Sequence, residues 1–175
     1  MVSSNALFDN SILGTSVRSQ IPERHVLRAL ELTDFNKGYV DCLANLTITG
    51  AVTSQMFAES FEEMQRAGCY FVIVIENLET NTIVASGTLV VEQKFIRGCG
   101  RVGHIEDIVV AKGQQGKRFG FTIIKQLLDI GAATGCYKSI LDCSPENVTF
   151  YEKCGLENKG VVQMAMYTPG TAPKK

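Results

Sequence analysis

The stretch VVAKGQQGKRFGF, residues 109–121, changes from a strand pattern to a helix pattern within a few residues. A β-branched run ends, and three glycines arrive together with two cations before an apolar helical pattern begins. The glycines are Gly113, Gly116 and Gly120, and the cations are Lys117 and Arg118. Such a turn exposes backbone N–H groups beside the positive end of the helix dipole. The stretch therefore predicts a strand-to-helix turn at which a pyrophosphate binds.

Two better-known phosphate motifs do not fit this turn. The P-loop ends in Gly-Lys-Ser or Gly-Lys-Thr, whereas residues 116–118 read GKR. The dinucleotide fingerprint has a different glycine spacing. Taken alone, the pattern leaves open an ordinary helix N-terminus preceded by loop glycines.

Hydrophobic periodicity on both sides of the turn predicts an α/β fold. β-Branched runs indicate strands, and apolar residues at i, i+3, i+4 and i+7 indicate helices. The predicted elements are a strand at 25–32, helices capped by Thr33 and Thr53, strands at 70–76, 82–92 and 104–110, a helix at 120–131, a strand at 139–143, a helix at 147–155 and a strand at 160–167. This order predicts a mixed sheet covered by helices.

The chain length predicts one domain. At 175 residues the chain is long enough to bury a core of its own. We expect a flexible N-terminal arm over residues 1–22, the domain over residues 23–168 and a flexible tail over residues 169–175. The reason is that the first stretch is rich in Ser and Asn, and the tail has the same character.

Composition excludes several classes of function. Lys and Arg number 17 against 18 for Asp and Glu, so no overall basic field attracts nucleic acid or an anionic membrane. The apolar runs are too short to span a bilayer, and the N-terminus lacks a secretory signal pattern, so we expect a cytoplasmic protein. Six cysteines without a Cys-x-x-Cys pair, and only two histidines, predict no metal site.

Several separated motifs carry a resemblance to a known family. QGKRFG at residues 115–120 resembles the coenzyme A motif of the GNAT acetyltransferases, which is Gln or Arg, two residues, Gly, one residue, then Gly or Ala. Four further motifs resemble the members of that family that acetylate glucosamine 6-phosphate. They are KFIRGCG (94–100), HIEDIVV (104–110), GCYKSILDC (135–143) and NVTFYEKCG (147–155). The resemblance spans residues 25–167.

This resemblance implies a fold and a reaction. The fold is that of the GNAT acyl-CoA N-acyltransferases, an α/β fold with a mixed, mostly antiparallel sheet flanked by helices. The reaction moves the acetyl group of acetyl-CoA, as co-substrate, directly onto the amine of glucosamine 6-phosphate, without an acetyl-enzyme. It lies on the path to UDP-N-acetylglucosamine. The resemblance also implies a homodimer with active sites at the subunit interface.

The resemblance assigns catalytic positions to Asp142, Tyr151 and Glu106. Asp142 orients or deprotonates the attacking amine, directly or through water, and Tyr151 donates its hydroxyl to the departing thiolate. Glu106 contacts the sugar. Simple exposure at a strand end is an alternative explanation for Glu106, and packing beside Phe150 is one for Tyr151.

The cofactor contacts follow from the same resemblance. Backbone N–H groups of residues 108–110 bond the pantetheine arm and polarise the thioester carbonyl, and those of residues 115–120 bind the pyrophosphate. The full set is Ile108, Val109, Val110, Gln115, Gly116, Lys117, Arg118, Phe119, Gly120, Asp142, Asn147 and Tyr151. Asn147 also fits an ordinary helix cap. Arg118 stands where the motif usually has Gly, and we expect the preceding N–H groups to keep the phosphate site.

The implied acceptor carries a phosphate and therefore needs cations. The implied substrate contacts are Thr47, Lys94, Phe95, Ile96, Arg97, Glu106, Asp107, Tyr137 and Lys138, of which the last two reach across the dimer. Met166 stands where many relatives carry a cation, so we expect phosphate affinity to depend more on Lys94, Arg97 and Lys138. Cys143, beside Asp142, is expected to be buried and inert.

Two rival functions remain. One is a GNAT enzyme for another amine, such as a polyamine or a protein N-terminus, but a cationic acceptor would need an acidic pocket. The other is a catalytically silent acyl-CoA-binding module, against which the retention of Asp142 and Tyr151 argues. An assay of thiol release with a panel of amines separates these functions.

Overall fold

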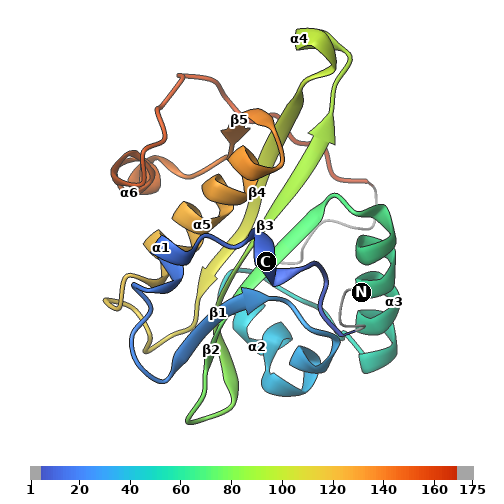
Figure 1. Cartoon of the computed structure of the whole chain (residues 1–175), viewed down its shortest axis with the longest axis vertical. Coiled ribbons are helices and arrows are strands. Elements are labelled where there is room, and N and C mark those ends of the chain that lie inside the picture. Colours follow the sequence, from blue (N-terminus) through green and yellow to red (C-terminus); the bar gives the residue numbers. More distant parts are fainter. Residues whose placement is uncertain (1–4, 169–175) are drawn as a thin grey trace. The chain divides into compact units, whose positions relative to one another are not determined.

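The structure is a computed structural model that describes residues 5–168, and it divides the chain into two compact units, residues 1–141 and 142–175. In the described part of the first unit, five strands form one sheet in the order β1-β2-β3-β4-β5 (Figure 1). The strands are β1 (His25–Ala29), β2 (Tyr70–Asn77), β3 (Thr82–Gln93), β4 (Arg101–Val110) and β5 (Cys136–Ile140). The first four pair antiparallel, and β5 pairs parallel to β4. The predicted mixed, mostly antiparallel sheet is confirmed.

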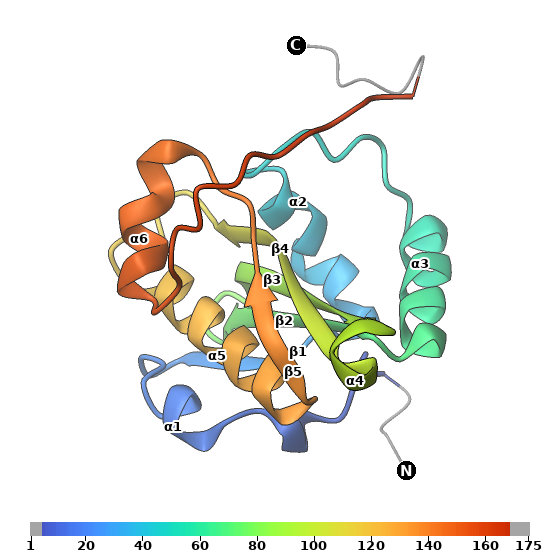
Figure 2. The ribbon, with the colours of Figure 1, turned by 90° about the horizontal axis from the view of Figure 1, so that it is seen from above.

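Helices cover both faces of this sheet. Figure 2 shows α5 (Phe119–Ala133) and α1 (Thr15–Arg18) on one face, and α2 (Tyr39–Leu43) and α3 (Ser54–Ala67) on the other. The remaining helical elements are η1 (Asn10–Ile12), η2 (Leu32–Lys37), α4 (Ile96–Cys99), η3 (Pro145–Asn147) and α6 (Val148–Lys153). Among the described residues, no helix is both long and apolar enough to cross a membrane.

Helix α5 packs closely because its apolar stripe meets a glycine in the sheet. Phe119, Ile123 and Leu127 recur at helical spacing and are almost completely buried. A Cβ atom on Gly87 of β3 would lie only 2.5 Å from Cγ2 of Ile123. Each such buried side chain stabilises the fold by about 1.5–3 kcal/mol. The glycine thus fixes how near the helix lies to the sheet.

The helix expected after Thr33 is broken into two pieces. The 3₁₀ turn η2 begins at Leu32, and Gly38 then adopts φ 73° before α2 starts at Tyr39. The η2 turn before the break places Asp34 in a buried ionic cluster. The Arg28 guanidinium on β1 donates to Asp34 Oδ1 of η2 at 2.7 Å and to Glu76 on β2. A buried cation needs such partners, and these bonds join β1, η2 and β2.

The predicted Thr53 cap of the next helix, α3, is confirmed, since the Thr53 side chain accepts from Met56 N at 3.2 Å.

The N-terminal residues differ from the expected flexible arm. Residues 5–22 pack on the first unit through the buried Leu7, Leu13 and Val17. Leu7 N donates to Leu30 O at 2.8 Å, and Asn10 Oδ1 accepts from Ala29 N at 2.7 Å. These bonds cover the free edge of β1, which would otherwise expose unpaired backbone groups. Residues 1–4 and the expected tail at 169–175 lie outside the described residues.

The second unit contains η3 and α6, followed by a segment without regular structure. The helix predicted at 147–155 is confirmed as α6. The strand predicted at 160–167 is wrong for this chain alone, because residues 156–168 form no strand. Four apolar side chains of that segment are more than 80% exposed: Val161, Val162, Met164 and Met166. A strand needs a partner strand to satisfy its backbone, and none is paired here within the described residues.

Candidate active site

A cavity of about 570 Å³ lies on the α2–α3 side of the sheet. Its polar lining includes Thr47, Thr49, Ser60, Thr88, Glu106 and Asp107. Three of these, Thr47, Glu106 and Asp107, are predicted substrate contacts from distant parts of the chain. The fold therefore brings together part of the predicted substrate site. Thr88, which pairs with Glu106 across β3 and β4, was not foreseen.

A bulge in β4 shapes this side of the cavity. Ser86 pairs with Val109 and Thr88 with Glu106, so two residues of β4 face the single residue Gly87. One of the two, Asp107, has φ 53°, which is uncommon for a residue other than glycine. A bulge interrupts the ladder and redirects backbone groups. Both Glu106 and Asp107 are exposed, so the strand does not bury these two acids.

Tyr39 of α2 lies beside the bulge and was predicted only as a residue of a helix face. Its side chain is buried and lines the cavity. Burial raises the pKa of the Tyr39 hydroxyl above its usual range, and the negative charge of Asp107 raises it further. The hydroxyl therefore stays protonated next to an acid at the cavity wall. Helical periodicity could have marked Tyr39 as buried, but not its proximity to Asp107.

The glycine-rich turn joins β4 to α5 as predicted. Gly113 and Gly116 have φ 81° and 83°, and Arg118, at the N-cap of α5, has φ 62°. Arg118 replaces a glycine of the motif in a conformation that glycine favours. Its guanidinium carbon lies 4.9 Å from the ring centroid of Phe121. The Arg118 side chain thus lies along the outside of the helix, and the exposed turn stands at the N-terminus of a 15-residue helix.

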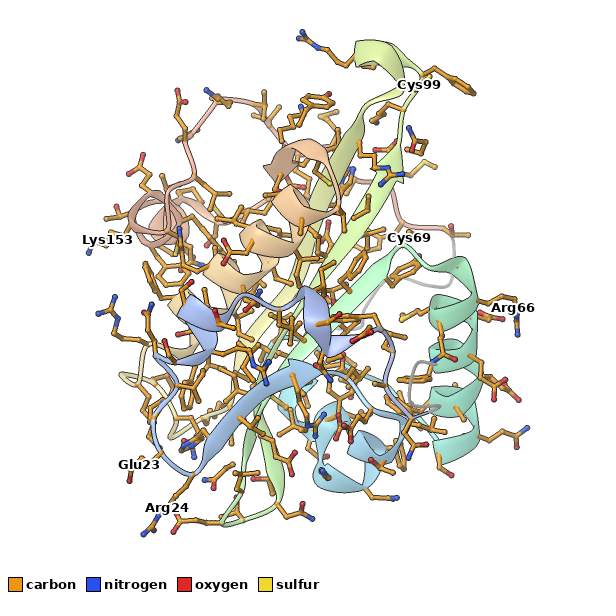
Figure 3. All side chains as sticks on the ribbon, viewed as in Figure 1. Glu23, Arg24, Arg66, Cys69, Cys99 and Lys153 are labelled. Carbon is orange, nitrogen blue, oxygen red and sulfur yellow. The ribbon has the colours of Figure 1, made fainter. Side chains whose placement is uncertain are left out.

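The hairpin between β3 and β4 extends beyond the sheet and carries α4 at its tip (Figure 1). Phe95 and Ile96, two predicted substrate contacts, are 97% and 64% exposed there. Arg97 has φ 57°. Figure 3 shows Cys99 at the same tip. In the single chain, this part of the predicted site therefore lies at the protruding end of a hairpin.

Lys94, at the base of that tip, is paired with a carboxylate. Its Nζ lies 2.6 Å from Oε1 of Glu92, and Nε2 of His104 lies 2.8 Å from Oε2 of the same side chain. Hydrogen bonds from Lys94 and His104 hold the pKa of the Glu92 carboxyl below its usual range. Glu92 and His104 were not predicted as site residues. Alternation along the predicted hairpin places them on the same face and could have indicated the pair.

Tyr137 and Lys138 lie on β5, the edge strand opposite β1. Tyr137 is 45% exposed, and Lys138 Nζ lies 5.9 Å from the centroid of the Tyr137 ring. Both side chains are thus available to ligands or to another subunit.

The second unit holds the predicted residues Asp142, Asn147 and Tyr151. Asp142 lies beyond β5 instead of closing a strand, and its Oδ2 accepts from Gln163 Nε2 at 3.1 Å. Asn147 stands at the N-cap of α6, but its side chain makes no capping bond and donates to Ser144 Oγ at 3.1 Å. Cys143 is exposed, which corrects the expectation of burial.

Tyr151 packs beside Phe150, as the alternative explanation for this residue predicts. Its ring packs edge-on against Phe150, with centroids 5.0 Å apart. Burial raises the pKa of the Tyr151 hydroxyl, and the neighbouring thiols of Cys143 and Cys154 raise it further. The hydroxyl therefore remains a hydrogen-bond donor at neutral pH. Within residues 5–168, no cluster of three or more His, Cys, Asp or Glu side chains is arranged to hold a metal ion.

Comparison with known proteins places this chain in a family. Residues 28–156 match the family model described as Acetyltransferase (GNAT) family. The chain belongs to the GNAT family. It is 51% identical over 148 residues to glucosamine 6-phosphate N-acetyltransferase 1 of Dictyostelium discoideum, which covers 84% of this chain and 92% of that protein.

Solved GNAT structures share the fold. The crystal structure of glucosamine-6-phosphate N-acetyltransferase from Arabidopsis thaliana superposes with a TM-score of 0.80 at 44% identity, over 83% of this chain and 99% of that one. A predicted acetyltransferase with acetyl-CoA from Clostridium acetobutylicum has a TM-score of 0.62 at 14% identity, over 81% and 96% of the two chains. As GNAT enzymes use acetyl-CoA as co-substrate, the glycine-rich turn before α5 is the natural candidate for its pyrophosphate.

Proposed function

We propose that this chain transfers the acetyl group of acetyl-CoA to the amine of glucosamine 6-phosphate, giving N-acetylglucosamine 6-phosphate and CoA for UDP-N-acetylglucosamine synthesis. The observation that carries the proposal is the joint placement of Thr47, Glu106 and Asp107 in one cavity beside the β4 bulge. The 51% identity to an enzyme named for this substrate supports the choice of acceptor.

In this proposal the amine attacks the thioester directly. The new C–N bond forms as the C–S bond breaks, the amine loses a proton, and CoA leaves as a thiolate. Backbone N–H groups of residues 108–110, redirected by the bulge, stabilise the negative charge that develops on the carbonyl oxygen. Asp142 orients the amine or takes its proton, and the protonated hydroxyl of Tyr151 donates to the thiolate.

The acceptor's phosphate is the feature that an assay can test. Lys94, Arg97 and Lys138 supply the cations, and Lys94 must share its charge between Glu92 and the phosphate. Purified protein with acetyl-CoA should release thiol much faster with glucosamine 6-phosphate than with glucosamine. A site built to bind a polar group of its substrate rejects the analogue that lacks this group by up to about 10⁴–10⁵-fold, because the polar groups of the site are then left unpaired. Equal kcat/KM for the two sugars, or preference for a polyamine, would reject this acceptor.

We also propose that the enzyme is a cytoplasmic homodimer whose subunits share their active sites. The exposed apolar side chains of Phe95 and Ile96 in the first unit, and those of the segment 161–166 in the second, support the dimer, because exposed apolar surface is typical of interfaces. Six free cysteines favour a reducing compartment.

A further inference from the structure

The cavity beside the β4 bulge is much more apolar than a sugar phosphate requires. Beyond its polar residues, the lining is formed by side chains of α2, α3, the loop between them and the sheet. They are Leu30, Tyr39, Val40, Leu43, Leu46, Ile48, Val52, Met56, Phe57, Phe61, Met64, Tyr70, Val72 and Val90. A sugar hydroxyl or phosphate oxygen placed against such walls would lose its hydrogen bonds to water without replacement. The polar acceptor therefore suits only the part of the lining that holds polar side chains, among them Thr47, Glu106 and Asp107.

The apolar and the polar side chains line one and the same cavity. Leu43 lines this cavity together with Thr47, Glu106 and Asp107. Tyr39 in turn lies near Asp107, the residue of the bulge. Leu43 is partly buried and packs against the core of this unit. Asp107 directly precedes Ile108, the first residue whose N–H is proposed to hold the thioester carbonyl, so the transferred group is expected beside the cavity that Leu43 lines.

We propose that this apolar space receives the acyl chain of the thioester, so that the enzyme also transfers acyl groups longer than acetyl, such as propionyl and butyryl, from their CoA thioesters. This inference rests on the proposed function. The added methylene groups would lie among Val40, Leu43 and Val72, where burial of apolar surface is favourable.

The chemistry is the same for each chain length. The C–S bond of the thioester breaks, an amide C–N bond forms, the amine proton leaves, and CoA departs as a thiolate that is then protonated. No further reactant is needed. Selection between acyl groups therefore depends on space near Leu43, and a pocket that lacks room for one methylene typically discriminates by about 10–200-fold.

The test compares kcat/KM for acetyl-, propionyl- and butyryl-CoA, with glucosamine 6-phosphate held constant. We expect propionyl-CoA to react within about tenfold of acetyl-CoA, since no steric penalty of the usual size applies. Leu43→Ala should raise the butyryl-to-acetyl ratio, and Leu43→Phe should lower it. Leu78→Phe is the matched control, because Leu78 is exposed in the turn between β2 and β3 and should leave the ratio unchanged.

A propionyl-to-acetyl ratio below about one tenth that Leu43→Ala leaves unchanged would overturn the inference. If thermal denaturation shows that the Leu43→Phe protein is not folded, Leu46→Phe narrows the same cavity at another lining residue, which is 47% exposed. Failure of the proposed function is distinguishable, because acetyl-CoA would then give no thiol release with glucosamine 6-phosphate.

Discussion

Tyr151 and Asp142 are the residues whose chemistry can be tested most directly. The protonated Tyr151 hydroxyl should stabilise the leaving thiolate, and Asp142 should assist the amine, so both act in the transition state. We therefore expect Tyr151→Phe and Asp142→Asn to lower kcat more than they raise KM. General acid–base help is worth about 10²–10⁴-fold, and Tyr151→Phe should fall at the low end because a thiolate leaves readily.

The measurement is steady-state kinetics for both substrates. Asp41→Asn is a suitable control, since Asp41 is an exposed carboxylate on α2. If both variants keep their kcat and lose only affinity, Tyr151 and Asp142 hold ligands, and proximity alone carries the catalysis.

At the level of one structural element, the glycine-rich turn and α5 form the proposed pyrophosphate site. Gly120 lies in the first turn of this helix, where a side chain would stand between the N–H groups and an anion. Gly120→Val should raise the Kd for acetyl-CoA at least tenfold in calorimetry. Helix propensity does not oppose this substitution, so the protein should fold.

Ala132→Val is the matched control, because it adds the same side chain at an exposed position near the other end of α5. It should leave acetyl-CoA affinity unchanged. Unaltered affinity in a folded Gly120→Val protein would move the pyrophosphate away from this turn.

The whole molecule is expected to be a dimer. Val162, on the segment without secondary structure, is 82% exposed, and a charged residue at such a position weakens an apolar interface. Sedimentation velocity should show a dimer for the native chain and a shift towards monomer for Val162→Asp. Leu78→Asp, which changes another exposed apolar residue, should not shift the equilibrium. A fully active native monomer would contradict shared active sites.

Local chemistry explains why much of this fold could be predicted. The Thr53 side chain caps α3 because a helix start needs an acceptor for its free N–H groups, and this is readable from a few residues. The turn at residues 113–118 follows from glycines that tolerate positive φ. Such features depend only on neighbours in the chain. The predicted turn, α5 and the acids of β4 therefore appear where expected.

Other features depend on residues far apart in the chain. The bulge at Asp107 arises from the register between β3 and β4, and the Arg28 cluster joins three elements that meet only in the folded unit. The residues at 160–167 form a mostly apolar run that suits a strand, but they pair with no other strand among the described residues, and a strand needs a neighbouring strand for its backbone hydrogen bonds. Pattern and composition thus specify which segments suit a helix, a strand or a phosphate turn. The cavity, the β4 bulge and the segment without a partner strand follow from packing, since burial and pairing are properties of the partners that the folded chain provides.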